Sequence, residues 1–144
     1  KYIDLSQFDN IIFYFGNIDI RFHLGSKLNP IEATKDLFNR YINFAKNYKS
    51  TLVNLLPIEN ESRKLPKSGQ YKGENFFGTW EERNNIKNIA NDIMNNSGIK
   101  ILHWPSHIIN DNRELDFNFM EPGKSVHLRP KFYMNELKKQ LTLF

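Results

Sequence analysis

Three ionisable side chains stand at alternate positions directly after an apolar, aromatic-rich run. The run extends from Ile11 to Phe15 and predicts a buried strand. A glycine ends it, and Asp19, Arg21 and His23 follow. If the extended conformation continues, the acid, the guanidinium and the imidazole lie on one side, just past the strand. Ligands of open α/β sheets bind at that edge, so this spacing predicts a binding or catalytic site.

The same three residues also have a structural interpretation. Asp19 and Arg21 can form an ion pair that closes the end of the strand, with His23 on the surface. Structural ion-pair networks perturb charges as active sites do, without any chemistry. Spacing alone leaves both interpretations open.

Histidines later in the chain indicate two other kinds of site. His127 precedes a helix that Pro130 starts, so the imidazole is either a general base or a partly buried cap of that helix. His103 and His107 are four residues apart, but the Trp-Pro dipeptide between them disfavours the helix that a metal-binding pair needs. We therefore expect no metal site and no cofactor.

Composition limits the class of protein. The 144 residues suffice for a single domain, 1–144, with one core. The net charge is +4, but the lysines are scattered, so we expect no nucleic-acid partner. The lack of cysteine excludes disulfides, zinc-thiolate sites and cysteine nucleophiles. No apolar stretch reaches the roughly 20 residues of a membrane span and no signal peptide is visible, which favours a cytoplasmic protein with no membrane partner.

Predicted strands alternate with predicted helices along the chain. We expect strands over 10–15, 51–57 and 99–104, and helices from Pro30 to about Tyr48, from a cap at Thr79 to a stop at Gly98, and from Pro130. The loop 58–78 is either a lid or an ordinary insertion. This order predicts an α/β fold with a parallel sheet whose carboxyl ends share one edge.

Several motifs resemble the later part of an SGNH (GDSL-like) hydrolase domain. Residues 15–19, Phe-Gly-Asn-Ile-Asp, resemble the G-x-N-D block that ends a strand, and more closely a variant written F-G-E-I-D-x-R. Residues 55–57, Leu-Leu-Pro, are similar to the family strand that ends in proline. The Arg-Asn-Asn at 83–85 resembles its asparagine-bearing helix. Residues 111–115 followed by 125–128, Ser-Val-His-Leu, resemble the D-x-V-H-L ending.

The resemblance implies a flavodoxin-like parallel sheet with flanking helices and the hydrolysis or transfer of acyl esters. It implies that His127 is the catalytic base and that Gly16 lies at the oxyanion turn. We further predict that Asp19 is a catalytic residue. The residues predicted to bind an acylated glycan or a small ester are Gly16, Asn17, Arg21 and His23.

The sequence departs from the family pattern at three places. No G-D-S nucleophile block precedes the first strand, Ile18 replaces the expected asparagine, and Lys124 replaces the aspartate expected before His127. A missing N-terminal segment or a partner chain could supply the serine. Alternatively, the chain is an inactive glycan- or ligand-binding module in which Arg21 is a bidentate donor. A third interpretation is a structural subunit with an exposed apolar face.

Overall fold

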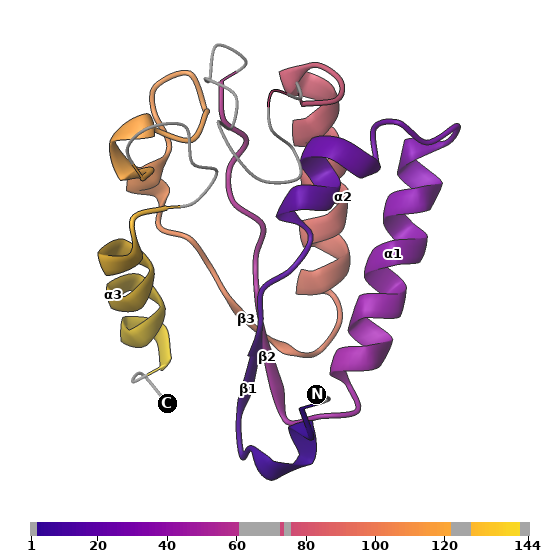
Figure 1. Ribbon diagram of the computed structural model, residues 1–144, viewed down its shortest axis with the longest axis vertical. Coiled ribbons are helices and arrows are strands. Elements are labelled where there is room, and N and C mark those ends of the chain that lie inside the picture. Colours follow the sequence, from indigo (N-terminus) through magenta and orange to yellow (C-terminus); the bar gives the residue numbers. More distant parts are fainter. Residues whose placement is uncertain (1–2, 61–72, 74–75, 122–127, 142–144) are drawn as a thin grey trace.

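A parallel sheet of three short strands separates two groups of helices (Figure 1). The computed structural model describes residues 3–60, 73, 76–121 and 128–141. The strands β1 (Ile11–Phe13), β2 (Ser50–Val53) and β3 (Lys100–Leu102) lie in the order β1-β2-β3. Phe13 pairs with Leu52, and Leu52 with Ile101. The predicted α/β class with a parallel sheet is therefore confirmed.

The helices begin where their capping residues predict. Helix α1 (Pro30–Ala45) starts at its proline, with the Asn29 side chain accepting from Glu32 N. Helix α2 (Trp80–Asn95) starts with the capping box, in which Thr79 and Glu82 exchange hydrogen bonds. Helix α3 (Pro130–Leu141) also starts at a proline. Their ends are less well predicted, since α1 stops three residues before the predicted Tyr48 and α2 ends at Asn95, three residues before Gly98.

The strands are shorter than predicted because the chain leaves the sheet early at its carboxyl edge. After Val53 the chain stays buried through Glu59, and Asn54 N still donates to Leu102 O at 3.0 Å. The segment after β3 then diverges toward α3 (Figure 1). The residues that follow each strand therefore have different neighbours from those expected if the strands had their predicted lengths.

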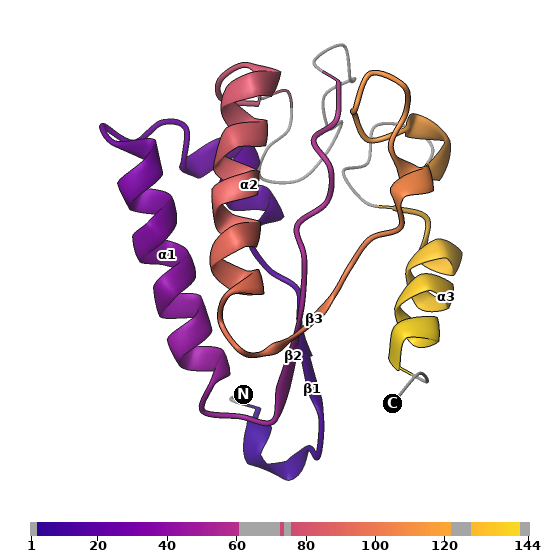
Figure 2. The same ribbon diagram turned by 180° about the vertical axis from the view of Figure 1, so that it is seen from behind.

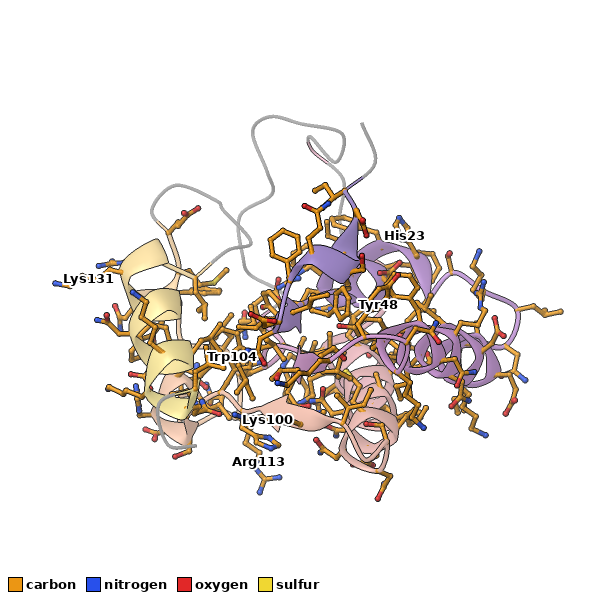
Figure 3. All side chains as sticks on the ribbon, turned by 90° about the horizontal axis from the view of Figure 1, so that it is seen from below. His23, Tyr48, Lys100, Trp104, Arg113 and Lys131 are labelled. Atoms are coloured by element: carbon orange, nitrogen blue, oxygen red, sulfur yellow. The ribbon has the colours of Figure 1, made fainter. Side chains whose placement is uncertain are left out.

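Each face of the sheet carries its own apolar cluster. Helices α1 and α2 cover one face side by side, and α3 with the short 3₁₀ turns η3 (Ser106–Ile108) and η4 (Phe117–Phe119) lies on the other (Figures 1 and 2). The larger cluster lies beneath α1 and α2 and includes Phe38 and Met94. The smaller one is centred on Leu56, Ile108, Leu115, Met120 and Leu128, and Trp104 packs against it between α3 and the sheet (Figure 3).

The strands run upward in Figure 1, so their carboxyl ends point toward the end of the molecule at which α1 and α2 begin. A short segment η2 (Asp19–His23) lies at this end as well. Among the described residues, no helix has the length and apolar character that crossing a membrane requires. The predicted site residues that the structure describes are therefore found where parallel sheets hold their ligands.

Candidate functional site at the carboxyl edge of the sheet

The turn after β1 requires glycine. Gly16 has a φ of 100°, and a Cβ at this position would lie 2.6 Å from the Phe38 ring. The next side chain is also fixed, because Asn17 Oδ1 accepts from Leu56 N at 3.0 Å. Gly16 and Asn17 thus join the end of β1 to α1 and to the segment after β2. A role in binding substrate stays a prediction for both.

The extended conformation predicted for residues 19–23 is wrong. These residues form one π-helical turn, in which Leu24 N donates to Asp19 O at 2.8 Å. The chain coils because Ile20 and Leu24, four residues apart, both reach the core. Residues at alternate positions therefore do not share a face, and Arg21 points away from the pair formed by Asp19 and His23.

Arg21 is part of a buried ion pair, and its partner is Glu59 rather than the predicted Asp19. Nε and Nη2 of Arg21 donate to the two Glu59 carboxylate oxygens at 2.6 and 3.2 Å. Nη1 donates to Asn17 O at 3.0 Å. The side chains are only 4% and 0% exposed. Arg21 is a bidentate donor, as predicted for a ligand, but it binds a carboxylate of its own chain.

The Phe76 ring lies against two arginines of this edge. The guanidinium carbons of Arg21 and Arg83 lie 5.8 and 5.4 Å from its centroid. Phe77, next in the chain, donates its N–H to Arg21 O at 2.7 Å. The described end of the predicted lid is therefore packed on the π-helical turn. Residues 61–72 and 74–75 of that segment lie outside the described residues.

Asp19 and His23 form a hydrogen-bonded pair on the surface. His23 Nδ1 lies 3.0 Å from Asp19 Oδ1, and both side chains are partly exposed. His23 lies on the side of the molecule that carries α1 and α2 (Figure 3). Because an ionised carboxylate only accepts, the hydrogen bond requires the proton on Nδ1, which makes Nε2 the basic nitrogen. This orientation is the one that an imidazole needs in order to act as a base.

The other histidines are in separate surroundings. His103 Nδ1 lies 2.9 Å from Nδ2 of the Asn54 side chain. The His107 ring packs against Phe119 and Phe132. Within the described part of the chain, no group of three potential metal ligands occurs. His127, the predicted base, lies outside the described residues, whereas Leu128 beside it is buried in the smaller cluster.

Four of the described serine hydroxyls bond to groups close to them in the chain. Ser6 bonds to Asp4, Ser26 donates to His23 O, and Ser50 donates to Ala45 O. Ser97 accepts from Ile99 N. These contacts resemble turn and helix-end contacts rather than an activated nucleophile.

Sequence reasoning missed the partner of Arg21 and the pairing of Asp19 with His23. A signal for the second existed, since Asp19 and His23, and likewise Ile20 and Leu24, are spaced four apart as on a helix. Comparison with known proteins adds no further information: no family model matches the chain, and no curated protein or solved structure is significantly similar to it.

Proposed function

We propose that this protein is an SGNH-type ester hydrolase or acyl transferase that acts on an acylated glycan or a small ester. The observation that carries the proposal is the Asp19–His23 pair, an oriented imidazole at the carboxyl edge of a parallel sheet. The strand order, with helices on both faces, is compatible with the later part of a flavodoxin-like fold.

Two histidines are candidates for the general base. His127 has this role through the family resemblance, and His23 through its hydrogen bond to Asp19. The base takes a proton from the attacking hydroxyl, the oxygen attacks the ester carbonyl, and the proton passes to the leaving alcohol. In this proposal Gly16 and Asn17 bind the substrate through their backbone groups, because the Asn17 side-chain oxygen already accepts from Leu56 N.

The nucleophile is assigned to a serine outside the described residues, on another segment or on a partner chain. Strand β1 is at the edge of the sheet in the described part of the chain, and Ile12 on the strand and Phe15 just after it are exposed. Exposed apolar side chains on an edge strand are the surface that an added strand covers. A strand with the serine would reach the same carboxyl edge as the Asp19–His23 pair.

A binding module without catalysis is the second candidate. It is favoured by the local hydrogen bonds of Ser6, Ser26, Ser50 and Ser97, and by the internal partner of Arg21. In such a module Asp19 and His23 would hydrogen-bond a sugar or a carboxylate.

Replacing His23, His127 and, as a control, His107 one at a time tests the proposal. The substrates are p-nitrophenyl acetate, p-nitrophenyl butyrate and an acetylated oligosaccharide, assayed with the chain as it occurs in its native polypeptide. Loss of a general base lowers kcat by about 10²–10⁴-fold, so His127→Ala or His23→Ala should show that loss. His107→Ala is the matched control, because its ring packs on phenylalanines of the smaller cluster.

The outcomes separate the two functions. Full activity of both His23→Ala and His127→Ala would exclude the proposed bases. A folded wild-type protein that binds the oligosaccharide without cleaving it would favour the binding module.

A further inference from the structure

An apolar groove opens between the first turns of α1 and α2, beside the π-helical turn that carries Asp19 and His23. Its volume is about 280 Å³. An apolar cavity of about 150 Å³ holds benzene, so the groove has room for an alkyl chain of medium length. We propose that the groove binds an uncharged alkyl chain of about six to eight carbons. Resting on the proposed function, this chain is the acyl group of the ester substrate.

Apolar side chains form the walls and the floor of the groove. Those in the lining are Leu28, Ile31, Phe77 and Ile86. Ile86 is almost completely buried, whereas Leu28, Ile31 and Phe77 are exposed to solvent. Apolar side chains gain free energy when a ligand removes them from water. Three of them around one hollow therefore favour an apolar ligand.

Three polar side chains of the lining have partners within the protein. Asn29 caps α1, and the Glu82 carboxylate accepts from Thr79 N in the capping box of α2. Arg83 donates from Nη1 to Gly78 O. Glu82 and Arg83 are neighbours of opposite charge, so the lining prefers neither an anion nor a cation. A charged ligand would lose hydration here without gaining a partner, which favours an uncharged one.

The geometry of the walls is fixed by close packing. A Cβ on Gly25 would lie 2.9 Å from the Phe77 ring, so this ring rests on bare backbone. The Phe77 N–H is bonded to Arg21 O. The groove is therefore present without ligand, which limits the entropy lost on binding.

The groove is next to the Asp19–His23 pair along the chain. Gly25 lines the groove and follows His23 by two residues, so their Cα atoms are no more than about 7.6 Å apart. Ser26 Oγ donates to His23 O, which keeps this connection compact. An acyl chain in the groove would therefore place its ester carbonyl near His23, one of the two candidate bases.

Binding of the alkyl chain is measured without turnover, by NMR titration of the ¹⁵N-labelled native polypeptide. The probes are hexan-1-ol and hexane-1,6-diol, which differ by one terminal hydroxyl. We expect saturable shifts for hexan-1-ol that include the Gly25 and Ile86 amides, with an affinity about threefold or more above that for the diol, because the second hydroxyl loses hydration in an apolar groove. No saturable shift with hexan-1-ol, or equal binding of the diol, would overturn the proposal.

Charged probes of the same length test the preference for an uncharged ligand. Hexanoate and hexylammonium at pH 7 should bind no more tightly than hexan-1-ol, because the charges of the lining are of both signs and have partners. Tighter binding of either ion would overturn the assignment of an uncharged ligand.

One substitution at an exposed position locates the site without touching the core. Ile31→Gln makes one wall polar and should weaken hexan-1-ol binding about threefold or more. Ile109→Gln is the matched control, because Ile109 and Ile31 are 40% and 41% exposed and Ile109 is absent from the groove lining. The same loss in both variants would place the alkyl chain elsewhere and overturn the proposal.

A series of esters links the groove to the proposed hydrolysis. The substrates are the p-nitrophenyl esters of acetate, butyrate, hexanoate and octanoate. A fully buried CH₂ group strengthens binding about fourfold, so an open groove should raise kcat/KM about twofold per added CH₂. Ile31→Gln should flatten this rise and Ile109→Gln should not.

The outcomes separate the groove from the catalytic proposal. An active enzyme with no dependence on chain length would show that the groove does not hold the acyl group. Inactivity toward all four esters would contradict the proposed function, whereas the hexan-1-ol titration would still decide whether the groove binds an alkyl chain.

Discussion

Arg21 shows how a residue suited to ligand binding can instead hold the fold together. Its guanidinium makes a two-point contact with Glu59, which follows β2, and so joins the π-helical turn to the neighbouring segment. Both charges are almost completely removed from water, at a desolvation cost of several kcal/mol each. Such a pair stabilises only while both members are present.

Replacing Glu59 should therefore destabilise the protein strongly. Glu59→Gln leaves the Arg21 charge buried without its counter-ion, and we expect the free energy of unfolding to fall by about 3 kcal/mol or more. Urea denaturation measures this loss. The matched control is Glu32→Gln, which breaks the exposed Glu32–Lys35 pair and should cost no more than about 0.5 kcal/mol. Equal losses in the two variants would mean that the buried pair contributes little.

Sequence predicted the type of these side chains but not their partners. The acid, the guanidinium and the imidazole were expected together on an extended strand, and the structure separates Arg21 from the other two. The choice between strand and helical turn depends on whether Ile20 and Leu24 find a core to enter, which is a tertiary property. The partner of Arg21 is 38 residues away in the chain, and local spacing carries no information on such a contact.

At the scale of elements, prediction succeeded where the signal is local. The starts of α1 and α2 are fixed by Asn29 with Pro30 and by the capping box of Thr79 and Glu82, all within three residues of the helix end. The predicted ends of the strands were less accurate, because the pairing between two strands stops where one of them leaves the sheet. Prediction therefore recovered the order of elements and the edge that holds the candidate site, but not the geometry within it.

The cap of α2 can be tested directly. Thr79 Oγ1 accepts from Glu82 N, and Thr79→Ala removes this bond, so we expect a loss of about 1 kcal/mol in the free energy of unfolding. Thr79→Ser keeps the hydroxyl and should remain within a few tenths of a kcal/mol of the wild type. Thermal or urea unfolding distinguishes the two, and equal losses would show that the methyl group rather than the cap is important.

At the scale of the whole molecule, β1 and α1 are joined by aromatic rings around Tyr41. The Tyr41 ring lies 5.8 to 6.4 Å from the rings of Phe13, Phe15 and Phe38, and its hydroxyl oxygen is buried. Burial raises the pKa of Tyr41 well above its ordinary value of 10.0. Burial has the opposite effect on Lys87 and lowers the pKa of its amine below the ordinary value of 10.5. Both pKa shifts affect the free energy of unfolding at alkaline pH. Because folding raises the pKa of Tyr41 and lowers that of Lys87, the two effects have opposite signs.

Tyr41 predicts a loss of stability above about pH 10. Below this pH the phenol is neutral in both states; above it the unfolded chain releases the proton while the folded protein keeps it, so the free energy of unfolding falls as pH rises. Lys87 acts in the reverse direction, because the folded protein releases its proton first and stability rises until pH reaches 10.5. Urea unfolding between pH 8 and 11 should show a flatter alkaline decline for Tyr41→Phe and a steeper one for Lys87→Met, since each variant removes one of the two opposing contributions. An unchanged slope in Tyr41→Phe would mean that the hydroxyl reaches water readily, and that the ring cluster between β1 and α1 is looser than its packing indicates.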